Sequence, residues 1–172
     1  MKSVYNFVVS PKGNRYNNDV DINGEKLILN TDIFNHKYVN REATIISTPI
    51  IGDTNIKVDD TVILHHNVFR RWNDMNGVEK NSRSYFNEST YFINSDQIFL
   101  YKRKNKWIAP KGYCFVKPLK STNEFSVETE QPLQGVVKYS DGTVKVGDLV
   151  GFRPNSEYEF IVDGERLYRV LS

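Results

Sequence analysis

The stretch that decides the fold is residues 144–152, VKVGDLVGF, together with its near copy at residues 56–64, IKVDDTVIL. The copies lie 88 positions apart and share an apolar residue, Lys, Val, Gly or Asp, Asp, and a later Val. Asp59 stands where the other copy has Gly147, and both residue types tolerate left-handed backbone conformations. The pattern predicts a tight turn that enters a β-strand, present twice in the chain.

Two further pairs of segments repeat in the same order. Residues 88–95, ESTYFINS, are similar to residues 165–172, ERLYRVLS, and residues 5–11 are more weakly similar to residues 113–118. Chance similarity among β-rich segments is the alternative interpretation, but the shared order favours an internal repeat.

The repeat divides the chain into two expected domains, residues 1–104 and 105–172. The second has no counterpart of residues 96–101, DQIFLY, and is therefore expected to lack a final strand. Either the chain is trimmed there or another chain completes the edge, since an open strand edge invites pairing. The charged run at residues 102–106 is interpreted as a short linker between the two halves.

Composition agrees with a strand-rich chain. The sequence holds 10 Tyr, 10 Phe and 2 Trp, and aromatic and β-branched residues favour strands. Strand-like runs alternate with turn signals such as Ser140-Asp141-Gly142, and helical periodicity is absent. We therefore expect an all-β fold of barrels or sandwiches. Residues 11–21 and 121–130 have little to bury and are interpreted as loops.

Several classes of protein are excluded at this stage. No apolar run approaches the length of a transmembrane helix, and residues 1–10 do not resemble a secretory signal. Cys114 is the single cysteine, which excludes an internal disulfide. A cytoplasmic location is expected, that of the host if the chain is encoded by a phage. The net charge of +2 is too balanced to imply nucleic-acid or membrane binding by itself.

The repeated unit resembles the GroES, or chaperonin-10, family of co-chaperonins. The matching pieces are the Lys-Val-Gly-Asp turn at residues 144–152 and 56–64, and the closing segment YFINSDQIF at residues 91–99. The resemblance implies two GroES-like β-barrels in tandem, a homo-oligomeric ring and capping of a GroEL-like chaperonin ring. It also implies a mobile loop, at about residues 11–37, that docks on the chaperonin through an apolar triplet.

By position, the triplet corresponds to Leu27, Ile28 and Leu29, which follow Gly24. Glu25 and Lys26 replace the family's second glycine and add charge beside the triplet. The second domain offers only Phe125 and Val127 in the comparable region, so the first is expected to bind the partner alone. A plain buried strand is the alternative interpretation of residues 27–29.

No catalytic, cofactor or metal site is expected. His65 and His66 are adjacent on a predicted strand, which would direct them to opposite faces, and His36 is distant in sequence. Cys114 lies in an aromatic strand and is interpreted as an inert buried thiol. The chain has no dinucleotide- or phosphate-binding glycine motif. We therefore predict a protein that is not an enzyme.

Two alternatives to a co-chaperonin remain open. Basic residues stand beside indoles in two places, and basic grooves with stacking aromatics bind single-stranded nucleic acids, although the balanced charge disfavours this interpretation. The residues concerned are Arg70, Arg71, Trp72, Lys102, Arg103, Lys104 and Trp107. The second alternative is a structural or assembly protein, such as a phage product, built on a GroES-like barrel.

Overall fold

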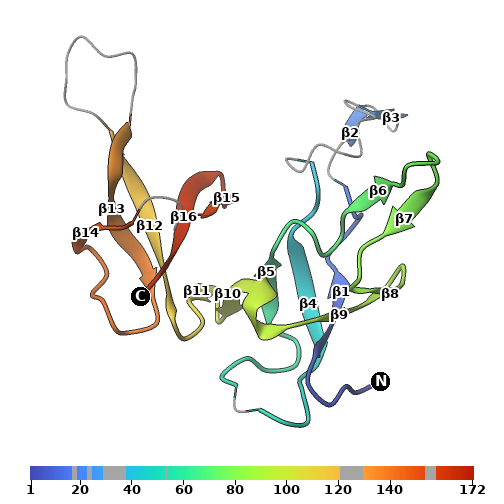
Figure 1. Ribbon diagram of the computed structural model, residues 1–172, viewed down its shortest axis with the longest axis horizontal. Coiled ribbons are helices and arrows are strands. Elements are labelled where there is room, and N and C mark those ends of the chain that lie inside the picture. The colour runs from blue at the N-terminus through green and yellow to red at the C-terminus, as the bar shows by residue number, and fades with distance from the viewer. Residues whose placement is uncertain (17–18, 23–24, 29–37, 53, 121–129, 154–157) are drawn as a thin grey trace. The chain divides into compact units, whose positions relative to one another are not determined.

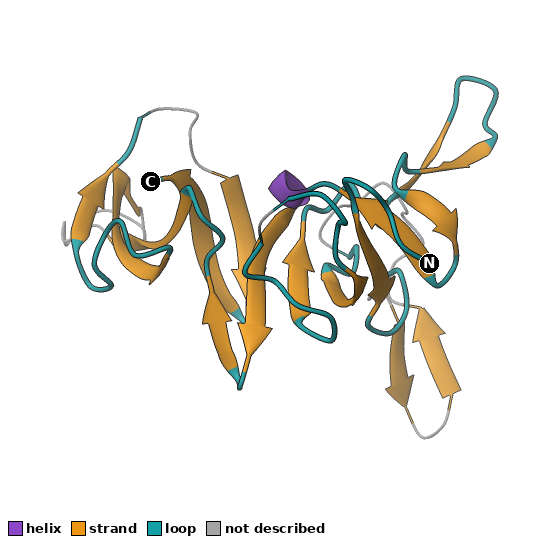
Figure 2. Cartoon of the chain, turned by 90° about the horizontal axis from the view of Figure 1, so that it is seen from below, coloured by secondary structure: helices purple, strands orange, loops and turns teal. Residues whose placement is uncertain are grey.

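The computed structural model describes the chain except for residues 17–18, 23–24, 29–37, 53, 121–129 and 154–157, and gives only the backbone of residues 19–22, 26–28, 120 and 130–132. Strands dominate the described residues, and their one helical element is a 3-10 turn, η1, at Ser95–Gln97 (Figure 2). The all-β prediction is confirmed. Within the described part, no helix has the length and apolarity needed to cross a membrane.

The chain divides into two compact units, Met1–Arg103 and Lys104–Ser172. The division predicted from the repeat, after residue 104, lies next to this boundary. Closure of each unit into a GroES-like barrel stays a prediction.

The first unit is built on six strands hydrogen-bonded in the order β10-β5-β4-β1-β9-β8, and β11, which follows the boundary at Arg103, pairs with β10 (Figure 1). Two hairpins, β2–β3 and β6–β7, form separate two-stranded sheets. The strands of the first unit are β1 (Phe7–Pro11), β2 (Asp19–Ile22), β3 (Glu25–Ile28), β4 (Glu42–Ser47), β5 (Thr61–Leu64), β6 (Arg71–Asn73), β7 (Glu79–Asn81), β8 (Tyr85–Asn87), β9 (Thr90–Ile93) and β10 (Ile98–Arg103). Strand β11 is Lys106–Ile108.

The second unit is a five-stranded sheet with the order β14-β13-β12-β16-β15. Its strands are β12 (Tyr113–Lys120), β13 (Glu130–Ser140), β14 (Leu149–Gly151), β15 (Tyr158–Val162) and β16 (Glu165–Leu171). This order matches β5-β4-β1-β9-β8 of the first unit strand for strand, whereas β10 has no counterpart among the described residues. The matched strands also keep the same register. The corresponding pairs are Val9–Ile45 with Val116–Val137, and Val9–Tyr91 with Val116–Tyr168.

The Lys-Val-Gly/Asp-Asp turn has the same hydrogen bonds in both units. In the first, the Asp59 amide donates to the Ile45 carbonyl at 2.9 Å, and the Ile45 amide donates to the Asp60 carbonyl at 3.0 Å. In the second, the Gly147 amide donates to Val137 at 2.8 Å, and the Val137 amide donates to the Asp148 carbonyl at 2.9 Å. Asp59 has φ +70° and Gly147 has φ +95°. The predicted left-handed turn and the internal repeat are both confirmed.

Each unit has its own core of aromatic and aliphatic side chains. Phe69 packs edge-on against Tyr91 in the first unit, with ring centroids 4.7 Å apart, and Phe115 packs against Phe160 in the second at 5.3 Å. All four side chains are buried. Aromatic residues therefore contribute largely to the cores, as burial of their large apolar surface favours.

Two local predictions need correction. The charged run at residues 102–106 holds the boundary between the units, as predicted, but it is not an extended linker. Strand β10 extends through Arg103, and Lys104 and Asn105 form a two-residue turn at φ +49° and +60° before β11. Two consecutive residues with positive φ are typical of tight hairpin turns. Residues 11–21 were expected to bury little, but Pro11 ends β1, and Arg15 and Tyr16 are only 8% and 6% exposed.

Candidate partner-binding loop

The predicted contact residues lie on a hairpin that stands apart from both main sheets. Strands β2 and β3 pair antiparallel, with Val20 opposite Leu27 and Asp19 opposite Ile28, and pair with no other described strand (Figure 1). Leu27 and Ile28 belong to β3, whereas Leu29 lies outside the described residues. The backbone of residues 27–28 is therefore not a strand of a main sheet. The predicted mobility of residues 11–37 stays a prediction.

The loop that carries this hairpin has a closed neck. Tyr16 and Val39 form an antiparallel bridge, and the Asn40 amide donates to the Arg15 carbonyl at 2.8 Å. The Asn40 side chain donates to the Lys12 carbonyl at 3.0 Å and is itself buried. The two ends of the loop are thus joined between β1 and β4 by buried residues.

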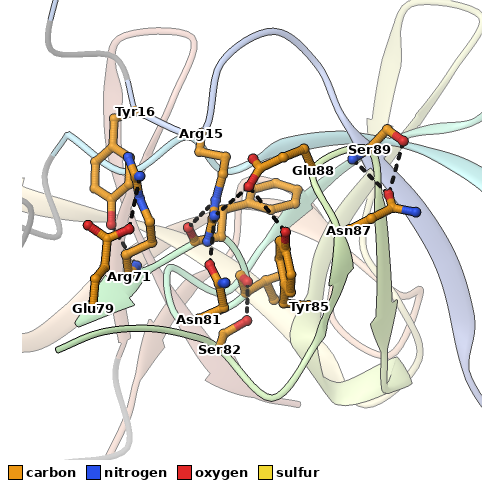
Figure 3. A network of polar contacts seen from close by, with 12 residues as sticks. Arg15, Tyr16, Arg71, Glu79, Asn81, Ser82, Tyr85, Asn87, Glu88 and Ser89 are labelled. Carbon is orange, nitrogen blue, oxygen red and sulfur yellow. Dashed lines mark hydrogen bonds and ion pairs between the residues drawn. The ribbon is translucent and has the colours of Figure 1, made fainter. Parts of the chain in front are cut away.

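Arg15 fastens this neck to the rest of the first unit (Figure 3). Its Nε donates to the Phe69 carbonyl at 3.1 Å, and its Nη1 donates to Asn81 Oδ1 at 2.8 Å. Nη1 also lies 3.6 Å from the Glu88 carboxylate, whose side chain is 73% exposed. A buried guanidinium is costly unless it is hydrogen-bonded and paired, and these contacts meet most of that need.

Aromatic rings complete the surroundings of Arg15. Its guanidinium carbon lies 5.3 Å from the Tyr85 ring centroid and 5.6 Å from that of Tyr91, within the range of cation–π attraction. Burial raises the pKa of Tyr91 to about 12, so its phenol stays neutral at physiological pH. Arg15 therefore lies against the neutral ring of Tyr91.

Tyr16 braces the neck from the other side. The Arg71 amide donates to the Tyr16 hydroxyl at 2.7 Å, and the Arg71 guanidinium carbon lies 5.2 Å from the Tyr16 ring centroid. Arg71 also forms an ion pair with Glu79 at 3.2 Å across the β6–β7 hairpin (Figure 3). The neck is thus held by residues that are far from it in the sequence.

Sequence reasoning missed Arg15 and Tyr16 as anchors. They stand in an Asn-rich segment with no apolar period, and Arg15 bonds to residues 54 and 66 positions away. The one local signal is the tyrosine beside an arginine, which is too common to identify an anchor without the tertiary contacts.

The basic residues of the nucleic-acid alternative are partly engaged with carboxylates. Arg103 donates to the buried Asp60 carboxylate, with Nη2 to Oδ2 at 2.6 Å, and Arg71 pairs with Glu79. Such pairing lowers the positive charge available to a phosphate backbone. Arg70 is half-buried and Trp72 is 45% exposed, so this pair of neighbours keeps accessible surface.

The remaining members of that set lie at the β10–β11 hairpin. Lys102 belongs to β10, Lys104 occupies the turn, and the Trp107 indole donates to Asp163 Oδ2 at 2.9 Å. These positions leave the nucleic-acid interpretation as an untested prediction.

The histidines do not behave as the sequence suggested. The His65 and His66 rings stack with centroids 4.4 Å apart, because β5 ends at Leu64 and the strand alternation does not extend to them. His36 lies outside the described residues. Across the described ranges, no three His, Cys, Asp or Glu side chains are grouped as a metal site would require.

Cys114 is buried, as expected, and burial raises the pKa of its thiol, which disfavours the reactive thiolate.

Comparison of the chain with protein-family models, with curated proteins and with solved structures found no match. The loop, its hairpin and its neck therefore have to be interpreted from their own geometry and from the repeat within the chain.

Proposed function

We propose that the protein is a co-chaperonin-like, non-enzymatic protein that caps a chaperonin ring through the hairpin loop of its first unit. The observation that carries the proposal is the β2–β3 hairpin, which stands outside both main sheets on a neck fixed by buried residues. A fixed neck sets the position of the loop, while the hairpin remains available to a partner. The sequence resemblance to the GroES family supplies the kind of partner.

The proposed contacts are the apolar side chains of Leu27, Ile28 and Leu29. Docking of so small an apolar patch is weak, because ordering a loop on binding costs conformational entropy. A homo-oligomeric ring overcomes this weakness, since several loops bind one partner ring together and avidity can exceed the single affinity by about 10²–10⁴-fold. The proposal therefore requires a ring of protomers.

The test is nucleotide-dependent binding to a purified double-ring chaperonin. The triple variant Leu27→Ser, Ile28→Ser and Leu29→Ser should abolish binding. The matched control is Ile50→Ser with Ile51→Ser, which removes two apolar side chains that are 65% and 56% exposed in another loop of the same unit. Binding that survives in the triple variant, or that is lost equally in the control, would contradict the loop assignment.

The oligomeric state separates the proposal from its alternatives. Native mass spectrometry and electron microscopy should show a closed ring. A ring that does not bind chaperonin would favour the structural or assembly protein. A monomer that binds oligonucleotides, with an affinity that falls steeply as salt rises, would favour the nucleic-acid interpretation.

A further inference from the structure

The two units differ at one sheet edge. In the first, β5 lies between β4 and β10, and β10 pairs with it antiparallel, with Tyr101 opposite Val62 and Lys102 opposite Thr61. In the second, the equivalent strand β14 pairs with β13 and is the terminal strand of its sheet (Figure 1). In the first unit, the edge that corresponds to β14 is thus covered by strand β10.

The backbone groups of β14 are oriented to accept such a strand. The Phe152 amide donates to the Leu133 carbonyl at 3.0 Å, as the Leu64 amide does to Arg41 at 2.8 Å. Successive amides of a strand alternate in direction, so those of Leu149 and Gly151 point away from β13. Unpaired strand edges of this kind recruit further strands.

Side-chain burial follows the same difference. Val62, Ile63 and Leu64 of the first unit are 0%, 3% and 0% exposed. Their counterparts in the second unit are half-buried or exposed: Val150, Gly151 and Phe152. Val150 and Phe152 pack against the core cluster that contains Cys114 and Val137, so an added strand would extend a core that already exists.

An aspartate precedes the edge strand in both units. Asp60 beside β5 is 7% exposed and binds Arg103, the last residue of β10, through both carboxylate oxygens. Its counterpart Asp148 is exposed, and its carboxylate makes no hydrogen bond or ion pair with the described residues. The edge thus presents a carboxylate that can accept from an arginine, together with backbone amides that pair with no other described strand.

We propose that β14 is the acceptor for a strand supplied by a partner protein. The occupant is an extended segment with the chemistry of β10: a short apolar and aromatic run followed by Lys and Arg, paired antiparallel with β14. Its arginine binds Asp148 as Arg103 binds Asp60, and its apolar side chains cover Val150 and Phe152. This inference is independent of the proposed co-chaperonin function, because that function uses the β2–β3 hairpin of the first unit, whereas this one uses strand β14 of the second unit.

The test uses the full chain and, as probe, a capped peptide with the sequence of residues 97–104, QIFLYKRK. Hydrogen exchange measured by NMR should show new protection of the Leu149 and Gly151 amides on adding the peptide. Asp148→Lys should weaken binding about tenfold or more, since a charge-assisted hydrogen bond is lost and a repulsion gained. The matched control is Glu159→Lys, the same charge change on β15 at the other edge of the sheet, which should change affinity less than about twofold.

A charge swap makes the test specific. A peptide with Glu at the position of Arg103 should bind the unchanged chain weakly and the Asp148→Lys variant more strongly. Absence of binding, protection at β15 instead of β14, or equal weakening by Glu159→Lys would overturn the proposal. Self-association of the chain that the peptide blocks would also overturn it, and would assign the edge to a second copy.

Discussion

The two units of this chain share five strands, one register and one turn, yet they bury the equivalent strand to different extents. β5 lies between β4 and β10, and Val62 and Leu64 are fully buried, whereas their counterparts Val150 and Phe152 in the second unit are only half-buried. The turn that precedes these strands has the same hydrogen bonds in both units. The comparison separates two effects: local sequence specifies the turn, whereas burial of the strand depends on whether a sixth strand lies beside it.

The units also differ in the loop between their first two long strands. In the first unit this loop carries the β2–β3 hairpin on a neck held by Arg15 and Tyr16. In the second unit the matching loop joins β12 and β13 through the pair Lys120–Glu130. Loops tolerate change more readily than the strands that they connect, so one scaffold can present different binding segments.

The largest effect on stability is expected from a substitution in β10, the strand that covers β5. Leu100 on β10 is fully buried, so Leu100→Ala should lower the free energy of unfolding of the first unit by about 2–5 kcal/mol. Leu149→Ala on the uncovered edge is the matched control and should cost less than about 0.5 kcal/mol. Chemical denaturation followed by residue-resolved hydrogen exchange reports each unit separately. Equal losses in the two variants would contradict the assigned difference in burial.

A smaller effect is expected from the ion pair at the end of β10. Burial by itself would raise the pKa of Asp60, but hydrogen bonds from Arg103 and from the Lys57 amide outweigh it and lower that pKa below 3.8. The ionised carboxylate thus stabilises the fold above that pH, and the contribution is lost as pH falls through the lowered pKa. Asp60→Asn should therefore cost about 1–3 kcal/mol at pH 7 and progressively less below pH 3.8.

The matched control for this ion pair is Asp148→Asn in the second unit. Asp148 is exposed and has no side-chain partner among the described residues, so its loss should cost less than about 0.5 kcal/mol. Thermal unfolding from pH 2 to pH 8 distinguishes the two variants. A pH-independent loss for Asp60→Asn would show that packing, and not charge, holds this position.

The left-handed turn position is tested by one substitution in each unit. Gly147 has φ +95° and open space around its α-carbon, so Gly147→Ala meets no clash and should cost about 1 kcal/mol through backbone strain alone. Asp59→Gly at φ +70° should change stability by less than about 0.5 kcal/mol, because relief of strain offsets the greater freedom of Gly in the unfolded chain. Urea denaturation measures both, and a large loss for Asp59→Gly would point to a side-chain role in the turn.

The fold was more predictable than the site, for a physical reason. The turn, the repeat and strands such as β5, β9 and β15 follow from local patterns of apolar, Gly and Asp residues, which a sequence displays directly. The three-residue strands β6, β7 and β8 are too short to display such a pattern, and they form by pairing, β6 with β7 and β8 with β9.

The neck of the loop was not predictable for a related reason. Arg15 is an anchor because Phe69 and Asn81 come to it in the folded chain, and nothing near Arg15 in the sequence indicates that contact. Conversely, the apolar residues 27–29 are visible in the sequence, but their role depends on whether the strand joins a main sheet. The isolated β2–β3 pairing bears on that question, which the sequence alone leaves open.

The smallest effect on stability is expected from the residues proposed to bind the partner. Strand β3, which holds Leu27 and Ile28, pairs with β2 and with no strand of a main sheet among the described residues. We therefore expect the triple serine variant at Leu27, Ile28 and Leu29 to leave both main sheets intact. Its free energy of unfolding should stay within about 0.5 kcal/mol of the unchanged chain, as for surface substitutions. A loss of about 2 kcal/mol or more would instead identify these residues as core, because burial of apolar side chains of this size contributes that much. Unchanged stability together with lost chaperonin binding would separate the function of the first unit from the scaffold that it shares with the second.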